Sequence, residues 1–460
     1  MKLIDAILPE AGGHAKDGHA QGGHAQGMPL LALVGSGGKT SAWVRLSREL
    51  PAPVIVTATA HLALEQTGLA DVWHSITDPG QIQRAFINLS GVTLFTGKPG
   101  VDGRTAGLDE AALAVLYRLA EDQCLPVLVE ADGSRRLPLK APAEHEPVIP
   151  AWVDQVVVVA GLSGLGRALS HETVHHPEIF ARLSGLAPGE IVTVETLARV
   201  LVHPRGGLKS IPVGAARIAL INQADNPALL AQAQTLARLL LPVFPRVIIA
   251  SLENGAAEEA VKSVYSPVAG VVLAAGGSTR FGGPKQLIDW FGQPMVRHVA
   301  RTALAAELDP VVVVVGAHQD GVRRALEGLP VIVVDNPDWA AGQSSSIRAG
   351  VEALPGETGA AIFLLSDQPQ APERLLSTLV ETHRQSLSPV VAPRAGGRRT
   401  NPVLFDRQTF ADLLGLTGDV GGRALFSKYR ITWVEWLDDR LAMDIDTPED
   451  YRRLFESMNE

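Results

Sequence analysis

Short runs of apolar and β-branched residues alternate with helical patterns along almost the whole chain. In the first half, the run LLALVG precedes an expected helix at 40–50, and the apolar runs PVIVTAT, LPVLVEADGS and DQVVVVAGL follow it. Such alternation is typical of βα units on a largely parallel sheet that is buried on both faces. We therefore predict an α/β fold. A hydrophobic fraction of 46% supplies the apolar residues that its cores need.

The chain is too long for one typical domain, and its alternation of strand-like and helical segments is interrupted once. Between about Ser251 and Pro267, the sequence SLENGAAEEAVKSVYSP interrupts the apolar rhythm with charged and small residues. The pattern then resumes, with strands expected near 270–275, 311–316, 330–334, 361–366 and 390–393 and helices near 296–306, 344–353 and 373–384. We predict two three-layer α/β modules, at 1–255 and 268–460.

Charge and cysteine content exclude several classes of protein. The net charge of −9 lacks the basic excess of a protein that follows a nucleic-acid backbone. Cys124 is the only cysteine, which rules out an intramolecular disulfide framework. The apolar runs are strand-length, far short of a membrane span, and the first nine residues lack the apolar core of a secretory signal. We expect a cytoplasmic protein without nucleic-acid or membrane partners.

One segment has no apolar period at all. Residues 12–27 read GGHAKDGHAQGGHAQG, with His14, His19 and His24 spaced five apart. We interpret this His/Gly-rich insert as a low-complexity loop.

The second module opens on a strand that runs into a glycine-rich turn, in the sequence GVVLAAGGSTRFGGPK from Gly270 to Lys285. Glycines let a backbone approach phosphate closely, and Arg280 and Lys285 can neutralise the charge on a departing pyrophosphate. A tight βα connection also favours glycine, but two cations at these offsets favour a triphosphate site. The expected nucleotide contacts are Ala274, Ala275, Gly276, Gly277 and Ser278.

The same stretch, LAAGGSTRFGGPKQL, resembles the signature of nucleotidyltransferases that activate sugars and molybdopterin. Five later segments resemble, in the same order, motifs of the MocA-type molybdenum cofactor cytidylyltransferases: DNPDWAAGQSSSIRAG, LSDQP, TNPVLF, GDVGGRALF and DIDTPEDY. The resemblance implies a Rossmann-like nucleotidyltransferase domain that transfers CMP from CTP to molybdenum-loaded molybdopterin. It also implies that Gly342, Ser344 and Ser345 lie on the nucleobase side.

The resemblance assigns catalytic roles to Arg280, Lys285 and Asp367, and Mg²⁺ ligation to Asp367 and Asp446. Asp367 follows the apolar strand AIFLL, and Asp446 precedes a helix opened by Thr447 and Pro448. Two carboxylates plus substrate phosphates form the oxygen set that Mg²⁺ prefers. For neighbouring aspartates such as Asp444, a cap or solvated turn is the favoured interpretation.

The sequence departs from the family at one position and leaves the acceptor open. Relatives often carry Gly-His-Pro where this chain has Thr400, Asn401 and Pro402, so a role for that imidazole does not carry over. A sugar or polyol phosphate is an alternative acceptor. A non-catalytic cofactor chaperone for a hydroxylase is an alternative of another class.

The first module carries the sequence LALVGSGGKTS between an expected strand and helix. This context predicts a P-loop-like nucleotide site for ATP or GTP, made by Gly35, Gly37, Gly38, Lys39 and Thr40. Lys39 contacts the phosphates in this interpretation, and Thr40 helps to hold Mg²⁺. The spacing is shorter than in the standard motif and resembles the loop of the Mur ligases. Glu130 and Asp132, at the end of a later strand, are placed as a Walker-B-like metal partner would be. A purely structural glycine turn is the alternative.

Longer segments of this module resemble the YqeC-type accessory proteins of selenium-dependent molybdenum hydroxylases: VEADGSRRLPLKAPAEHEPVIP, GLSGLGRALSHETVHHPE and ALINQAD. The resemblance implies a hydroxylase or its maturation factors as partners. ALINQAD also resembles the base-reading element of GTPases, with Gln223 in place of its lysine. We interpret His171, His175 and His176 as surface or satisfied polar residues in preference to a metal site.

Overall fold

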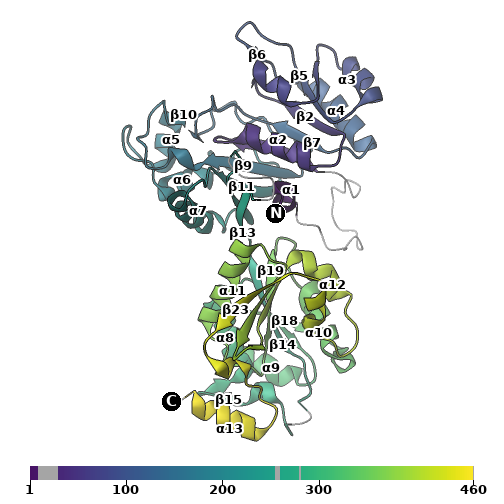
Figure 1. The fold of residues 1–460 in the computed structure, drawn as a ribbon, viewed down its shortest axis with the longest axis vertical. Helices are drawn as coiled ribbons and strands as arrows, with labels where there is room; N and C mark the ends of the chain where they lie inside the picture. Colours follow the sequence, from purple (N-terminus) through teal and green to yellow (C-terminus); the bar gives the residue numbers. More distant parts are fainter. Residues whose placement is uncertain (9–28, 254–258, 279–280, 459–460) are drawn as a thin grey trace. The chain divides into compact units, whose positions relative to one another are not determined.

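The computed structural model describes residues 1–8, 29–253, 259–278 and 281–458. The chain divides into two compact units, of which the first ends at Tyr265 and the second begins at Ser266. In each unit a parallel-rich β-sheet is flanked by helices, which confirms the predicted α/β fold (Figure 1). The insert at 12–27 lies outside the described residues.

The first unit is built on one large sheet. Its strand order is β13 (Val261–Tyr265), β12 (Arg246–Ala250), β11 (Ala216–Asn222), β9 (Gln155–Gly161), β1 (Leu30–Gly35), β7 (Val127–Glu130), β2 (Val54–Ala58), β5 (Val92–Thr96) and β4 (Val72–Ser75). Neighbours in this order are parallel except β12 and β13. β13 lies between the predicted module limits of 255 and 268. The predicted phosphate loop follows β1, near the middle of the sheet.

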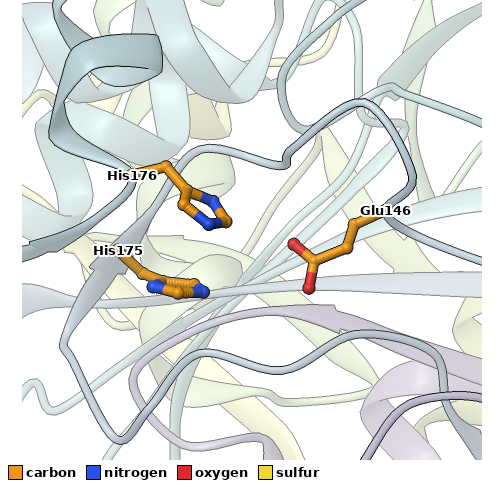
Figure 2. A group of neighbouring side chains, drawn as sticks. All are labelled: Glu146, His175 and His176. Carbon is orange, nitrogen blue, oxygen red and sulfur yellow. The ribbon is translucent and has the colours of Figure 1, made fainter.

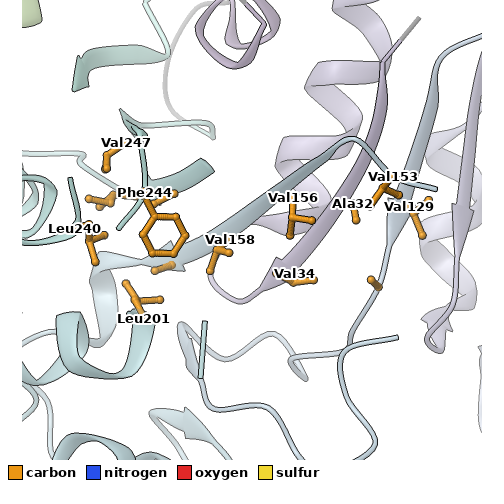
Figure 3. Packing of buried hydrophobic residues seen from close by; sticks show 14 of the residues in the cluster. Ala32, Val34, Val129, Val153, Val156, Val158, Leu201, Leu240, Phe244 and Val247 are labelled. Carbon is orange, nitrogen blue, oxygen red and sulfur yellow. The ribbon is translucent and has the colours of Figure 1, made fainter. Parts of the chain in front are cut away.

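Helices cover both faces of this sheet. They are α1 (Leu3–Ile7), α2 (Lys39–Glu49), α3 (Gly80–Ala85), α4 (Glu110–Asp122), α5 (Pro177–Ser184), α6 (Val194–Leu201) and α7 (Pro227–Leu240). On one face, Val34 of β1 and Val158 of β9 pack in one cluster with Leu201 of α6 and Leu240 of α7 (Figure 3). α2 packs against β1, β2 and β7, and none of its described residues belongs to that cluster, so it covers the opposite face.

Two short ribbons lie beside this sheet. β3 (Leu62–Ala63) pairs with β6 (Arg104–Thr105), and β8 (Leu139–Lys140) pairs in parallel with β10 (Val174–His175).

The second unit has its own sheet. Its strand order is β18 (Ile332–Asp335), β17 (Val311–Val315), β14 (Val268–Ala274), β19 (Ala360–Leu365), β22 (Val403–Asp406), β20 (Val390–Ala395) and β21 (Arg398–Arg399), and β23 (Ile431–Trp436) pairs with β20. The first four strands of this order are parallel, and β22 runs antiparallel to both its neighbours. β14, which precedes the glycine-rich turn, lies in the parallel half. A separate ribbon joins β15 (Asp289–Trp290) to β16 (Gln293–Pro294).

Alternating strand residues divide the core of the second unit into two clusters. The helices are α8 (Met295–Ala305), α9 (Gln319–Leu326), α10 (Gln343–Glu352), α11 (Glu373–Ser386), α12 (Phe410–Leu414) and α13 (Pro448–Ser457). Val272 and Val313 pack with residues of α8, α9 and α11. Their neighbours Val271 and Val312 pack with residues of α10 and α12. Successive strand residues point to opposite faces, so this unit has the predicted three layers.

Within the described part of the chain, no helix combines the length and the apolar character that crossing a membrane requires.

Candidate functional site

The predicted phosphate loop of the first unit connects β1 to α2. Gly35, Gly37 and Gly38 have φ angles of 96°, 76° and 136°, in the region that favours glycine. A Cβ at Gly37 would lie 2.4 Å from Cα of Gly161. Asn222, at the end of β11, donates its Nδ2 to the carbonyl oxygen of Gly37 at 2.9 Å. The loop is therefore held tightly against the carboxyl ends of the central strands, where α/β folds place their ligands.

Lys39, the first residue of α2, is buried in an ion-pair network. Its Nζ lies 2.5 Å from the carbonyl oxygen of Gly35 and 3.0 Å from Oδ1 of Asp132. Lys140 contacts the other oxygen of Asp132 at 3.0 Å and Oε2 of Glu146 at 2.7 Å. A bound phosphate would have to draw Lys39 away from Asp132.

Glu130, the predicted metal ligand of this unit, is buried at the end of β7. Burial raises the pKa of its carboxyl group, and the positive charge of Lys39 only partly opposes this effect. Its Oε2 has no hydrogen-bond partner among the described residues. An orphaned carboxyl oxygen at this depth fits a cation ligand. Asp132, rather than Glu130, is the carboxylate that contacts Lys39.

A pocket in the first unit lies beside this network. Residues of the loop, the ion-pair network and α6 line it, among them Gly35, Ser36, Asp132, Lys140 and Leu197. Thr40, predicted to help hold Mg²⁺, accepts a hydrogen bond from Nε2 of Gln66 at 2.7 Å.

The glycine-rich turn of the second unit follows β14. Gln286 donates its Nε2 to the carbonyl oxygen of Gly276 at 3.2 Å, and its Oε1 accepts from Oγ of Ser278 at 3.1 Å. This buried glutamine, which the sequence interpretation missed, holds the turn from inside. Ala274 and Ala275 are also buried. Arg280 lies outside the described residues.

Lys285 joins the two predicted metal ligands of the second unit. Its Nζ lies 2.9 Å from Oδ2 of Asp367 and 3.5 Å from Oδ1 of Asp446, and it also donates to the carbonyl oxygen of Ile445. Asp367 follows β19, whereas Asp446 precedes α13. The fold thus brings both carboxylates to one point beside the lysine, although they lie far apart in the sequence.

The predicted nucleobase segment begins at Gly342, immediately before α10. A Cβ there would lie 2.6 Å from Cα of Asp419, and its φ of 109° favours glycine. Ser344 donates its Oγ to the carbonyl oxygen of Gly418 at 2.6 Å, and Nδ2 of Asn336 donates to Ser345 at 2.9 Å. These hydroxyl groups therefore hold the segment itself in place.

Trp339 links this segment to the glycine-rich turn. A Cβ added at Gly277 would lie 3.2 Å from the ring of Trp339. Trp339 is 38% exposed, so the residue beside the turn is partly accessible to solvent. On the other side of the site, Asn401 donates its Nδ2 to Gln368, which in turn donates to Asp444 at 2.7 Å.

The three histidines singled out in the sequence, His171, His175 and His176, separate into two groups. His171 pairs with Glu178 at 3.1 Å on the surface. His175 and His176 instead lie near Glu146 (Figure 2), with their ligand atoms within 4.8 Å of one another. Burial, reinforced by the neighbouring His176 and Lys140 side chains, lowers the pKa of His175 to about 4. No local spacing connects Glu146 to the histidines, so the sequence interpretation missed this group.

Two family models match the chain. Residues 31–178 match the YqeC protein family, and residues 270–432 match the MobA-like NTP transferase domain. The YqeC protein of Escherichia coli (strain K12) is 34% identical over 42% of this chain and 75% of that protein. The nicotine blue oxidoreductase of Paenarthrobacter nicotinovorans is 31% identical over 41% of this chain and 96% of that protein. The chain belongs to both families.

The match to the YqeC family includes the phosphate loop, Asp132, Glu146 and the two neighbouring histidines. The match to the MobA-like domain includes Lys285 and Asp367, whereas Asp446 lies beyond its end. Among solved structures, Rv0371c of Mycobacterium tuberculosis H37Rv is 28% identical, with a TM-score of 0.38, over 42% of this chain and 99% of that one. We call the first unit the YqeC unit and the second the MobA-like unit, a nucleotidyltransferase domain.

Proposed function

We propose that the MobA-like unit is a molybdenum cofactor cytidylyltransferase. It transfers CMP from CTP to the terminal phosphate of molybdenum-loaded molybdopterin and releases pyrophosphate. The observation that carries the proposal is the convergence of Asp367 and Asp446 on Lys285 beside a glycine-rich turn. The match to an NTP transferase domain supports the reaction class, and the cytidylyl motifs of the sequence support the nucleotide and the acceptor.

Each charged side chain has a distinct task in this reaction. Asp367 and Asp446 offer only oxygen atoms and lie next to the phosphate-binding turn, so the donor set fits Mg²⁺. When bound, Mg²⁺ supplies charge neutralisation on the nucleotide phosphates. Lys285, released from the carboxylates, neutralises the leaving pyrophosphate. Arg280 is assigned the same task from the sequence alone.

The turn and the nucleobase segment position CTP for in-line attack. Glycines at Gly276 and Gly277 allow the α-phosphate to approach the backbone, while Ala275 and the segment from Gly342 to Ser345 bound the base. Catalysis then consists of positioning and charge stabilisation, because the acceptor phosphate is itself the nucleophile and no covalent enzyme intermediate is required.

We propose that the YqeC unit binds ATP or GTP at its phosphate loop and acts as an accessory module in the maturation of a molybdenum hydroxylase. The buried Lys39, a lysine at the start of a helix that follows a glycine loop, supports nucleotide binding. The orphaned oxygen of Glu130 and the carboxylate of Asp132 provide oxygen ligands for an accompanying Mg²⁺.

Mass spectrometry of the product tests the transferase proposal. The full-length protein is incubated with CTP, Mg²⁺ and molybdenum-loaded molybdopterin, and in parallel with a sugar phosphate or a polyol phosphate as acceptor. We expect a cytidine dinucleotide of the pterin and equimolar pyrophosphate. If a product forms only with the sugar phosphate or the polyol phosphate, that compound is the acceptor and molybdopterin is not. Tight pterin binding without any pyrophosphate release would favour a non-catalytic chaperone.

A further inference from the structure

A group of side chains of types that can bind a metal lies in the YqeC unit, apart from the phosphate loop and the glycine-rich turn. Glu146 belongs to the segment that follows β8, His175 ends β10, and His176 immediately precedes α5. The parallel pairing of β8 with β10 sets Lys140 opposite His175. Figure 2 shows the carboxylate of Glu146 facing the two imidazole rings. All three residues are half-buried.

The ring of His176 is oriented by a hydrogen bond. Its Nδ1 lies 3.0 Å from the carbonyl oxygen of Ala141. A carbonyl oxygen only accepts, so Nδ1 carries the proton and Nε2 keeps its lone pair. Metal-binding histidines are held in this way by a hydrogen bond at the nitrogen that does not bind the metal.

The backbone at His176 is in an unusual conformation. Its φ and ψ are 64° and 62°, in the left-handed region, directly before Pro177. For a residue other than glycine this conformation costs about 1–2 kcal/mol. Successive residues of an extended strand point to opposite sides, but here the rings of His175 and His176 lie with their centroids 3.8 Å apart. The strained residue therefore places two consecutive imidazoles on one side.

A lysine balances the negative charge of the group and positions its carboxylate. Lys140 contacts Oε2 of Glu146 at 2.7 Å and shares its charge with Asp132 at 3.0 Å. The lysine thus holds the Glu146 side chain in place beside the two rings, and the carboxylate of Glu146 is the group that we assign to a metal.

We propose that Glu146, His175 and His176 bind one divalent transition-metal ion, with Zn²⁺ as the best fit. Two imidazole nitrogens and one carboxylate are a ligand set of catalytic zinc sites, in which the fourth position stays open to water or a substrate atom. Mg²⁺ and Ca²⁺ prefer ligand sets made of oxygen alone. The ligand atoms lie within 4.8 Å of one another, so each separation needs to shorten by at most about 1.4 Å to reach the spacing of about 3.4 Å around tetrahedral zinc.

Equilibrium dialysis of the full-length protein against Zn²⁺ tests this site. Because the insert at 12–27 carries three more histidines, the measurements use a background in which His14, His19 and His24 are replaced by Gln. We expect one Zn²⁺ per chain in this background. We expect His175→Ala and Glu146→Gln each to weaken binding at least about tenfold.

Two further variants separate metal binding from folding. His176→Asn tolerates the left-handed backbone and keeps a side-chain donor for Ala141, but it lacks the imidazole nitrogen, so it should fold and still lose Zn²⁺. His171→Ala removes an exposed histidine of the same segment and should bind normally. Circular dichroism without metal checks the fold of each variant. Undiminished Zn²⁺ binding in folded His175→Ala, Glu146→Gln and His176→Asn would overturn the proposal, as would equal competition by Mg²⁺.

Discussion

Lys39 and Asp132 form an ion pair of 3.0 Å whose side chains are only 2% and 3% exposed. Removing one partner of a buried pair leaves an uncompensated charge and costs about 3–5 kcal/mol. We predict that Asp132→Ala lowers the free energy of unfolding of the YqeC unit by that amount. Chemical denaturation followed by circular dichroism measures it.

An exposed pair in the same unit provides the control. Arg48 and Asp71 lie 2.7 Å apart, with side chains 48% and 42% exposed. Surface pairs contribute at most about 1 kcal/mol, so Arg48→Ala should have a small effect. Equal losses in Asp132→Ala and Arg48→Ala would contradict the importance of the buried pair.

Nucleotide binding by the YqeC unit should depend on Lys39 and not on Lys285, the lysine of the other unit's loop. We predict that Lys39→Ala abolishes binding of labelled ATP or GTP by the full-length protein but leaves CTP turnover unchanged, because each unit has its own proposed phosphate loop. Lys285→Ala should have the opposite effects. If Lys39→Ala binds both purine nucleotides normally, the loop is only a structural turn.

The two carboxylates beside Lys285 should both be required for transfer. We predict that Asp367→Asn or Asp446→Asn slows Mg²⁺-dependent pyrophosphate release at least about a hundredfold, roughly 2.7 kcal/mol of transition-state stabilisation. Asp412 also pairs with a lysine, Lys428, at 2.5 Å but lies on α12. Asp412→Asn is therefore the matched control, and near-normal rates in both site variants would remove the metal assignment.

Ala275 is predicted to contribute to base choice. Its methyl group is buried at the start of the turn, and a Cβ at the neighbouring Gly316 would lie 2.9 Å from it. Overpacking by a purine at such a site costs about 1–3 kcal/mol. Polar groups that face cytosine's edge should add to this steric effect. We therefore expect kcat/KM for CTP to exceed kcat/KM for GTP by at least about a hundredfold. Ala275→Gly should narrow this ratio in parallel assays of the two nucleotides, and equal turnover of both by the unmodified protein would refute the cytidylyl assignment.

Stability should depend on pH through Asp406. Burial alone would raise the pKa of this carboxyl group, but the hydrogen bond to His383 at 2.8 Å and the charge of that ring hold it below its ordinary value. The ionised form therefore contributes stability that is complete above the unfolded-state pKa and is lost as the pH falls through the folded-state pKa.

We predict that Asp406→Asn costs about 1.5–3 kcal/mol at neutral pH, the range for a hydrogen bond to a charged group. Urea denaturation across a pH series should show this difference shrinking only below about pH 4. Asp335→Asn, which breaks an exposed pair with Arg323, is the control. A cost of Asp406→Asn that does not change at low pH would exclude the ionised form as its origin.

Local patterns predicted much of the fold. The expected strand at 311–316 is β17, at Val311–Val315, and the expected helix at 344–353 is α10, at Gln343–Glu352. The strand is a continuous apolar run and the helix has a clear helical period, so the local sequence is enough to predict each of them. The strand β13 was not expected, because its residues follow a charged segment and form a strand only through pairing with β12.

The predicted site residues converge only in part. Sequence resemblance pointed to Lys285, Asp367 and Asp446, which the fold brings together. The sequence indicated Asp132 as a metal partner beside Glu130, but not its ion pairs with Lys39 and Lys140. Gln286 acts through contacts with backbone carbonyls, and no spacing rule reveals contacts of this kind. Glu146 reaches the histidines for the same reason, through the pairing of two short strands far apart in the sequence.

The strand β13 determines where the chain can be divided for separate expression of its parts. Val261, Val264 and Tyr265 are buried in the first sheet, and β14 of the next sheet begins at Val268. A fragment that stops at residue 255 would expose the edge of β12, whose unpaired amide and carbonyl groups invite aggregation. A fragment that ends at Tyr265 keeps this edge covered, so the protein offers a single short window, between Tyr265 and Val268, for a cut that spares both sheets.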